Sequence, residues 1–321
     1  MSKTNEPIVL VGGGGGVYRV ARFLKQIRSN ITTIQTVFDH GHHSGQLRDE
    51  RGVLPPGDIR QAILALSDDN QEPTLRKLMN YRFSEKGGSS LNHATVGNIL
   101  LTALTEIEGS LPSAINTLCR LCNVRGQVLP VSLSNSELCA ELSDGSILRG
   151  EDKIDNRSIK DDRSIKQVYL EPQAHIFIDA YDALIKANKI VLCPGDIYTS
   201  LVPNLLVNGF AEALRLSRAK LIYIVNIMTK KAETDGFSVS DFVRVVHEHI
   251  PHREIDTVIY NSEILDPVIV KQYQTEKSKP VFLEGNVSQY DAHEILGKPL
   301  VDATGGIVRH HERIASVIAE L

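Results

Sequence analysis

The sequence predicts an α/β fold, a Rossmann-like and mostly parallel, doubly wound sheet that carries a small antiparallel β insert. Three observations predict it. A β-branched run at 8–11 leads through five consecutive glycines, Gly12 to Gly16, into an amphipathic helix. Strand-like and helix-like segments then alternate along most of the chain. Short alternating strands with turn signals between them occupy only about residues 125–170. We therefore expect residues 1–321 to form a single domain that contains this insert.

Residues 8–38 form the first predicted unit, a strand, a helix and a second strand. Apolar residues recur every three or four positions over 17–27, as on one face of a helix, and the β-rich run 31–38 follows. Two strands joined through a helix run parallel in one sheet. Further helices are predicted at 55–66, where two prolines precede the periodic residues, and at 95–109.

The middle of the chain changes character. Residues 127–150 show short alternating strands between Ser-Asn and Asp-Gly turn signals, which indicates antiparallel pairing. The next segment, 151–166, is dense in charge and is expected to be an exposed excursion. A last helix is expected over 307–321. Between these, the α/β alternation resumes at 189–193, 203–217, 220–227, 238–250 and 256–260.

Composition and charge exclude several classes of protein. Lys and Arg total 35 against 39 Asp and Glu, a formal net charge of −4 without any basic block, which argues against binding to nucleic acid. The chain has no apolar run of about eighteen residues and no secretory cleavage signal, so we expect a cytoplasmic protein without a membrane span. Cys119 and Cys122 form a CxxC inside a helical pattern without further ligands, and we interpret them as structural thiols.

The five glycines predict a phosphate-binding turn. Glycine adopts positive φ and leaves no Cβ in the way of a ligand, and the amides at the start of a helix point toward an anion. The alternative is a tight strand-to-helix turn without a ligand. Asp39 ends the second strand, where a doubly wound sheet presents an acid to a ribose hydroxyl or to a metal, and the alternative there is a turn-initiating aspartate.

The polar loop that follows is expected at the carboxyl edge of the sheet, where it could contact a ligand. Its candidate binding residues are Asp39, Ser44, Arg48, Asp58 and Arg60. Three histidines within four residues of this loop cannot all face one ion, so solvated imidazoles or one general acid/base are the alternatives to metal ligation. These histidines are His40, His42 and His43.

Two later strand ends are predicted to lie on the same rim as the glycine turn. The strand at 189–193 breaks at Pro194-Gly195 ahead of polar groups that suit a second phosphate or a sugar, namely Asp196, Tyr198, Thr199 and Ser200. The strand at 220–227 leads to Asn226, Thr229, Lys230, Glu233, Thr234 and Asp235. His93 and Asn98 flank a helix start. Helix capping is the alternative role for the Pro194 segment and for these two residues.

The chain resembles the gluconeogenesis factor family (uncharacterised protein family 0052), a branch of the 2-phospho-L-lactate transferase superfamily. The resemblance spans residues 7–260 and rests on the ordered motifs VGGGGG, SGQLRDERGVLPPGDIRQAILAL, YRF, NHATVGNILLTAL, GQVLP, CPGDIYTSLVPNLL and NIMTKKAETDGFS. It implies a Rossmann-like cytoplasmic protein that binds a nucleotide sugar such as UDP-N-acetylglucosamine. It also implies a role in cell shape or wall synthesis on gluconeogenic carbon sources.

Residues carried over by the resemblance cover every segment of the predicted rim. They are Gly12, Gly13, Gly14, Gly16, Asp39, Ser44, Gly45, Arg48, Asp58, Arg60, Gly97, Asn98, Pro194, Gly195, Tyr198, Thr199, Ser200, Asn226, Glu233 and Thr234. The chain departs from the family pattern at Gly15, at the histidines after Asp39, at Asp196 and at Lys231-Ala232. Loss of a second acid directly after Asp39 weakens the inference of a magnesium ion held by an acidic pair.

Three functions follow from these patterns. The first is a nucleotide-sugar-binding protein without turnover, with a UDP-sugar as the favoured ligand. The second is a Mg²⁺-dependent transferase, similar to 2-phospho-L-lactate transferase, that moves a phospholactyl group from a nucleotide-linked donor and uses Asp39 at the metal. The third, NAD-dependent oxidoreduction, is fold analogy alone. The ligand's base and sugar, turnover, the metal requirement, the oligomeric state and a regulatory protein partner are left open.

Overall fold

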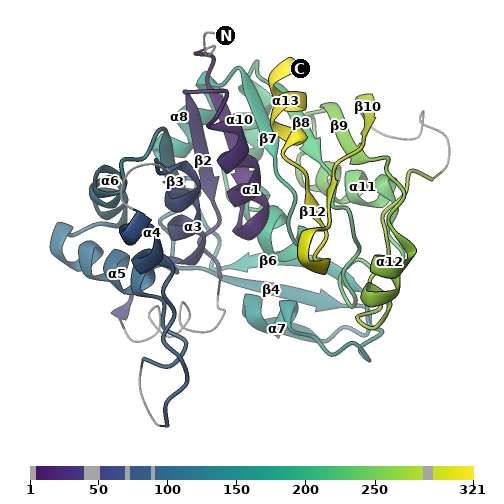
Figure 1. Cartoon of the computed structure of the whole chain (residues 1–321), viewed down its shortest axis with the longest axis horizontal. Coiled ribbons are helices and arrows are strands. Elements are labelled where there is room, and N and C mark those ends of the chain that lie inside the picture. Colours follow the sequence, from purple (N-terminus) through teal and green to yellow (C-terminus); the bar gives the residue numbers. More distant parts are fainter. Residues whose placement is uncertain (1–4, 40–50, 69–72, 88–90, 285–291) are drawn as a thin grey trace.

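The computed structural model describes residues 5–39, 51–68, 73–87, 91–284 and 292–321 (Figure 1). The predicted loop residues that lie outside these ranges are His40, His42, His43, Ser44, Gly45 and Arg48. Among the described residues, no helix combines the length and the hydrophobicity needed to cross a bilayer.

A parallel sheet of seven strands organises the molecule, in the order β10-β9-β8-β7-β1-β2-β3. Every neighbouring pair in this sheet is parallel, which confirms the predicted doubly wound α/β fold. The strands are β1 (Ile8–Gly12), β2 (Ile31–Gln35), β3 (Gln127–Pro130), β7 (Lys189–Leu192), β8 (Lys220–Ile224), β9 (Ile255–Asn261) and β10 (Ala292–Lys298). From β1 the chain first builds outward through β2 and β3 and then returns to β7 on the other side. The topological switch point therefore lies between β1 and β7, where ligands bind in open α/β sheets.

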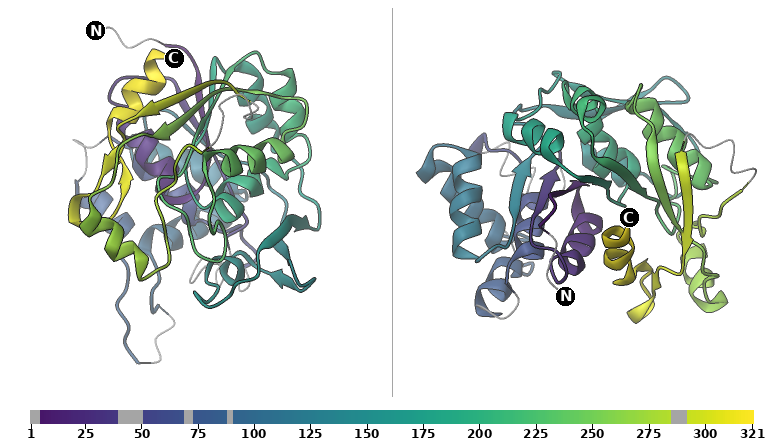
Figure 2. Two further views of the ribbon diagram at one scale, coloured as in Figure 1. Left: turned by 90° about the vertical axis from the view of Figure 1, so that its right-hand side faces the viewer. Right: turned by 90° about the horizontal axis from the view of Figure 1, so that it is seen from above.

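Helices cover both faces of this sheet (Figure 2). The central strand β1 is buried along its whole length, as a strand covered on both sides must be. On one face, α1 turns Val17, Val20, Ala21 and Leu24 into the core beside α3 and α13. The helices are α1 (Gly14–Leu24), α3 (Gly57–Leu66), α4 (Pro73–Asn80), α5 (Val96–Glu108), α6 (Leu111–Leu121), α7 (Glu151–Asp155), α8 (Ile178–Lys186), α9 (Val202–Leu205), α10 (Phe210–Leu216), α11 (Val239–His249), α12 (Pro267–Gln274) and α13 (Arg313–Glu320).

A second, antiparallel sheet of three strands forms the predicted insert. Its order is β5-β4-β6, from β4 (Glu137–Leu142), β5 (Ile147–Arg149) and β6 (Ile165–Glu171). The expected start near residue 125 is too early, because β3 pairs in parallel with β2 and belongs to the main sheet. The short apolar run of β3 fits a strand buried in a parallel sheet equally well, so alternation alone could not assign it.

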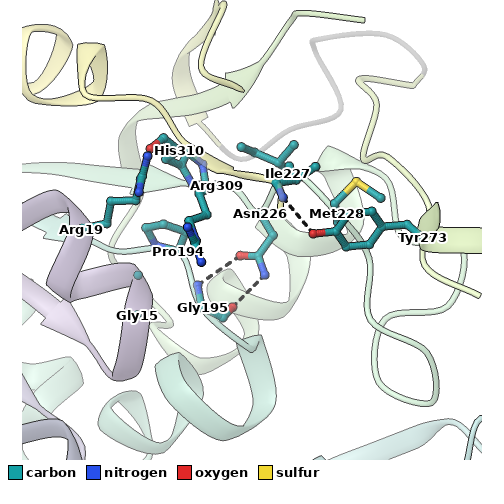
Figure 3. Close-up of a pocket in the computed structure, with 12 residues that line it drawn as sticks. Gly15, Arg19, Pro194, Gly195, Asn226, Ile227, Met228, Tyr273, Arg309 and His310 are labelled. Carbon is teal, nitrogen blue, oxygen red and sulfur yellow. Dashed lines mark hydrogen bonds between the residues drawn. The ribbon is translucent and has the colours of Figure 1, made fainter. Parts of the chain in front are cut away.

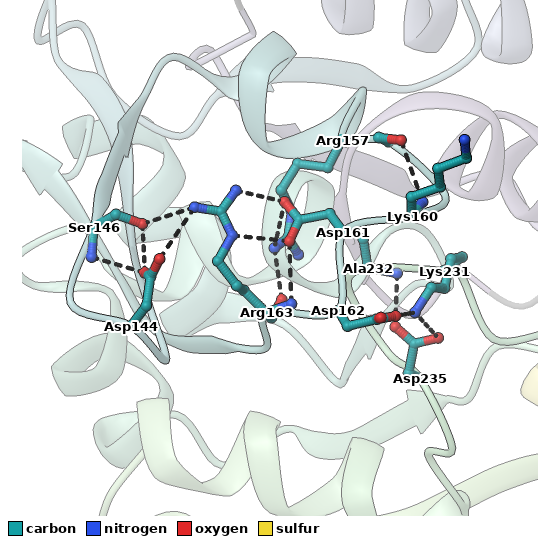
Figure 4. A network of polar contacts seen from close by, with 11 residues as sticks. Asp144, Ser146, Arg157, Lys160, Asp161, Asp162, Arg163, Lys231, Ala232 and Asp235 are labelled. Carbon is teal, nitrogen blue, oxygen red and sulfur yellow. Dashed lines mark hydrogen bonds and ion pairs between the residues drawn. The ribbon is translucent and has the colours of Figure 1, made fainter.

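The charged segment 151–166 is not the simple exposed excursion that the sequence predicts. Its first part is α7, which buries Ile154 completely. The Arg163 guanidinium forms an ion pair with the Asp161 carboxylate at 2.7 Å, and the Lys231 ammonium forms one with the Asp162 carboxylate at 2.9 Å (Figure 4). The segment is therefore tied by ion pairs to the loop that follows β8.

Two predicted helices are shorter than expected. The single helix expected over 203–217 is divided into α9 and α10, and a π-helical turn (Ile197–Leu201) precedes them. Gly209 lies between α9 and α10 and has φ +93°. A Cβ at Gly209 would lie 2.8 Å from a methyl group of Ile176, so close packing requires glycine and interrupts the helix. The last helix begins only at Arg313, because 309–310 form β12 and pair with β11 (Val301–Asp302).

All four cysteines are free. Burial raises the pKa of the Cys119 thiol to about 12 and also raises that of Cys122. The thiols of this CxxC therefore stay protonated and poorly reactive, as expected for structural cysteines.

Candidate functional site

A pocket of about 270 Å³ opens at the switch point, at the carboxyl ends of β1, β7 and β8 (Figure 3). One wall consists of Gly15 and Gly16 at the start of α1, and the floor includes Pro194 and Gly195 after β7. The other walls come from the loop after β8, from α12 and from β12. The pocket thus joins segments that are far apart in the sequence.

The glycine turn is a packing requirement and not a linker. A Cβ at Gly13 would lie 2.4 Å from a carboxyl oxygen of Asp58, and one at Gly16 would lie 1.6 Å from the carbonyl oxygen of Pro194. Gly14 adopts φ +58°, which side chains disfavour. In contrast, a Cβ at Gly15 would meet nothing within 4 Å. The glycines therefore bring α1 against the β7 end and leave Gly15 facing the pocket.

Asp58 lies under this turn and accepts a hydrogen bond from the Gly14 amide. Burial, and next the charge of Asp39, raise the pKa of Asp58 to about 7, although the Gly14 amide works in the opposite direction. The Asp58 carboxyl thus already accepts the hydrogen bond that the first amide of α1, that of Gly14, can donate. A ligand phosphate in the pocket would meet the amides of Gly15 and Gly16 instead.

Replacement of Asp58 by Asn is expected to change how stability depends on pH. With a pKa near 7 when folded and about 3.8 when unfolded, Asp58 holds more protons in the folded state within that window. Its contribution to the free energy of unfolding therefore falls as the pH rises from about 4 to 7. Denaturant titrations at pH 5 and pH 8 should show that the free energy of unfolding falls more between these two pH values for the wild type than for Asp58→Asn. Parallel pH profiles would show that Asp58 is not perturbed.

Asn226 joins two predicted strand ends. Its side-chain oxygen accepts from the Gly195 amide at 3.3 Å, and its amide nitrogen donates to the Gly195 carbonyl at 2.8 Å. The predicted convergence of the β7 and β8 ends on one rim is therefore seen directly (Figure 3). Both backbone polar groups of Gly195, its N–H and its C=O, therefore face the side chain of Asn226.

Two arginines line the pocket in different states. Arg19, on α1, donates to the backbone carbonyl of His310 and pairs with Asp302. Its guanidinium also lies 5.2 Å from the ring centre of Phe23. Arg309, on β12, is exposed, and within the described part of the chain no hydrogen bond or ion pair engages its side chain. Figure 3 shows the Arg309 side chain pointing toward the Pro194-Gly195 turn, where it is available to an anion.

The opposite end of the pocket is apolar. It is lined by Ile227, Met228, Val308 and the ring of Tyr273. The Tyr273 hydroxyl accepts a hydrogen bond from the Val308 amide at 2.8 Å, which holds α12 against β12. A ligand with an anionic part and a planar or apolar part would match both ends.

Several predicted site residues are engaged inside the protein. Arg60 is buried and donates to Asn98 at 2.9 Å and to Asn80 at 2.9 Å. The Thr229 hydroxyl accepts from the Lys279 amide at 2.9 Å, and the Thr234 hydroxyl accepts from the Lys230 amide at 2.8 Å. These groups shape the rim from behind and do not line the pocket.

The π-helical turn holds the predicted hydroxyl groups Tyr198, Thr199 and Ser200. Burial raises the pKa of Tyr198 to about 12. None of the three lines the pocket, and among the predicted rim residues that the structure describes, only Gly15, Gly16, Pro194, Gly195 and Asn226 do. The binding roles of the others, including Gly12, Asp39 and the weak metal assignment at Asp39, stay predictions.

An acidic cluster lies behind the rim. Carboxylate oxygens of Asp155, Asp196 and Glu233 lie within 4.8 Å of one another, a geometry that could hold a metal ion. The Lys230 ammonium already fills it, pairing with Asp155, with Asp196 at 2.9 Å and with Glu233 at 2.8 Å. Burial opposes the charge of Lys230, but the three carboxylates outweigh it and raise the pKa of the ammonium. The cluster is therefore an internal ion-pair network that connects α7 to the rim.

Among the charged and aromatic pocket residues, sequence reasoning missed Arg19, Tyr273, Arg309 and His310. Arg19 follows the glycine run at helical spacing, so its position beside a phosphate turn could have been inferred. The others lie beyond residue 260, where the periodicity is weak, and Arg309 and His310 were assigned to a helix.

Comparison with known proteins places these features in a family. The profile of the family 2-phospho-L-lactate transferase CofD matches residues 8–301. The gluconeogenesis factor of Listeria monocytogenes is 39% identical over an alignment of 326 positions, which covers 99% of this chain and 96% of that protein. The gluconeogenesis factor of Bacillus subtilis is 35% identical over 316 residues, covering 98% and 97%. A crystal structure of a UPF0052 family member from Bacillus halodurans superimposes with a TM-score of 0.90 at 35% identity, covering 98% of this chain and 99% of that one.

Proposed function

We propose that this protein is a cytoplasmic binding protein for a nucleotide sugar. The proposal starts from its family: the chain belongs to the gluconeogenesis factor family, within the 2-phospho-L-lactate transferase CofD family. A UDP-sugar is the favoured ligand. Its role would be in cell shape or wall synthesis during growth on gluconeogenic carbon sources, as the family resemblance implies.

The two-ended pocket at the switch point carries this proposal. Backbone amides at the start of α1 and the open guanidinium of Arg309 suit a pyrophosphate. The apolar end with Tyr273 suits a base or a sugar ring, which stacks on aromatic side chains. No recognisable nucleophile and base line this pocket in the described residues, so binding without turnover is the simpler function.

Isothermal titration calorimetry with UDP-N-acetylglucosamine tests the proposal. We expect saturable binding by the wild type, and a loss of about 10- to 100-fold in affinity for Arg309→Ala, because a charged hydrogen bond contributes about 1.5–3 kcal/mol. Arg22→Ala is the matched control, since Arg22 is an exposed arginine on α1 that does not line the pocket. Absence of binding at millimolar concentration would refute a UDP-sugar ligand.

A thermal-shift comparison identifies the base. A ligand at a hundred times its dissociation constant adds about 2.7 kcal/mol to the free energy of unfolding. UDP, GDP and NAD at equal concentration therefore separate the candidate ligands. Stabilisation by NAD alone would favour oxidoreduction, and stabilisation by GDP would favour the second function below.

Phospholactyl transfer is that second function, and the family profile together with the Asp39–Asp58 pair favours it. The negative charges of these two carboxyls repel each other, and carboxylate oxygens are ligands that Mg²⁺ prefers, so a magnesium ion held by the pair would relieve this repulsion. Bound there, the ion would neutralise phosphate charge. An assay with a guanosine-linked lactyl donor and a deazaflavin acceptor in the presence of Mg²⁺ decides, and no product would exclude this activity.

A further inference from the structure

One element of the pocket is held in place by contacts with residues far away in the sequence. We call residues 301–310 the C-terminal flap; it consists of β11, a short 3-10 turn (Thr304–Gly306) and β12. Gly305 and Gly306 both adopt positive φ in this turn. Because glycine adopts many backbone conformations almost equally well, these two residues do not by themselves hold the turn in one conformation. In the described part of the chain the two strands pair with each other and with no other strand, through Val301 with His310 and Asp302 with Arg309. Such a small ribbon needs anchors elsewhere.

The structure provides anchors on both sides of the pocket. On the α1 side, Arg19 donates to the His310 carbonyl and pairs with the Asp302 carboxylate, so one guanidinium holds both strands of the flap. On the α12 side, the Tyr273 hydroxyl accepts from the Val308 amide. Arg309 lies between these two anchors with its own guanidinium unengaged among the described residues.

The third anchor is the buried imidazole of His310. Its Nε2 lies 3.1 Å from the carbonyl oxygen of Val225, the residue that follows β8 and precedes Asn226. A carbonyl can only accept, so Nε2 carries the proton and donates. Burial lowers the pKa of His310 to about 4, and the nearby positive charge of Arg19 also disfavours a second proton. The ring therefore stays neutral and keeps this donor at physiological pH.

We propose that His310 is a positioning residue for ligand binding: its hydrogen bond to Val225 ties the flap to the β8 end and thereby holds Arg309 over the Pro194-Gly195 turn. This inference rests on the proposed function, because it assumes that Arg309 meets a ligand anion. Val225 and Asn226 are consecutive, and Asn226 already orders the Gly195 peptide on the pocket floor. His310 thus sets the flap against the same strand end that sets the floor.

A double-mutant cycle with UDP-N-acetylglucosamine tests the positioning role. We expect His310→Leu to weaken binding about tenfold, since one lost hydrogen bond near 1.4 kcal/mol corresponds to that factor. His310→Gln keeps an N–H donor of similar reach and should stay within about threefold of the wild type. In an Arg309→Ala background, His310→Leu should add less than about twofold. Equal weakening with and without Arg309, or no rescue by Gln, would overturn the proposal.

Amide hydrogen exchange separates this proposal from the proposed function. In the ligand-free full chain, His310→Leu should speed exchange of the Val308 and His311 amides, which bond to Tyr273 and Leu300. His310→Gln should not. If the wild type binds no nucleotide sugar, the proposed function fails, and the positioning role fails with it. Faster exchange would then still assign His310 to the flap anchor alone, and unchanged exchange in His310→Leu would overturn the anchor itself.

Discussion

Gly16→Ala is expected to lose a large part of the protein's free energy of unfolding. The added Cβ would lie 1.6 Å from the carbonyl oxygen of Pro194, and this neighbour is backbone that cannot rotate away. The two sides of the contact are fixed, because β1 and β7 pair in register up to Val11 and Leu192 and the Cys193 amide donates to the Val11 carbonyl at 2.9 Å. Overpacking costs about 1–3 kcal/mol and occasionally more, and a 1.6 Å contact with rigid backbone belongs at the upper end of this range. That is a large part of the roughly 5–15 kcal/mol by which an ordinary domain is stable. Circular dichroism with urea titration measures the loss.

Gly15→Ala is the matched control one residue away. Its Cβ would meet nothing within 4 Å, its φ is not positive, and alanine favours the helix by up to about 1 kcal/mol. We expect equal or slightly greater stability. Equal losses for the two variants would mean that the run as a whole needs flexibility, which would contradict a packing requirement specific to Gly16.

Much of the fold could be predicted because its signals are local. The glycine run, the helix periodicity of α1, α3 and α5, and the β-branched runs of β1 and β7 each appear within a short window. Strand β3 was placed in the wrong sheet, since partner choice depends on residues far along the chain. The end of the chain shows the same limit more strongly: β12 exists because Arg19 and Tyr273 hold it, and neither contact is visible in the sequence around Arg309.

The candidate site could be predicted in position but only partly in composition. Strand ends after β1, β7 and β8 must meet at one edge of a parallel sheet, which correctly brought Gly16, Gly195 and Asn226 together. Polarity does not say which way a side chain faces. Arg60, Thr229 and Glu233 are on the expected segments yet turn inward to protein partners. The cation that does open to the pocket, Arg309, comes from outside the recognised motifs.

Lys230→Met is expected to destabilise the protein by about 3–5 kcal/mol. The side chain of Glu233 is only 1% exposed, so removal of Lys230 leaves its carboxyl buried next to Asp155 and Asp196, where it must either carry an unpaired charge or take up a proton. Breaking a buried ion pair on one side costs about this much, because the remaining charge has neither water nor a partner. The free energy of unfolding from urea titration at pH 8 measures the effect.

The loss in free energy of unfolding caused by Lys230→Met should become smaller as the pH falls. Burial already raises the pKa of Glu233 to about 8 even though Lys230 opposes the shift, and without the ammonium the cluster should take up protons more readily. A carboxyl with a raised pKa binds more protons when folded than when unfolded, so stability of the variant rises as the pH is lowered toward about 5.

Lys231→Met provides the contrast that makes this prediction specific. The Lys231 side chain is 11% exposed, but its partners Asp162 and Asp235 are 82% and 46% exposed. Water can solvate these carboxylates when the lysine is removed, and pairs with exposed partners contribute only about 0–1 kcal/mol. The neighbouring lysine should therefore change stability little, and its small effect should be screened by salt. The network that contains Lys230 joins α7 to the β7 and β8 ends, whereas the insert partner of Lys231, Asp162, is 82% exposed. Lys230→Met should therefore speed amide exchange in the insert more than Lys231→Met does. Similar losses for both variants would show that Lys230 acts as an ordinary surface lysine.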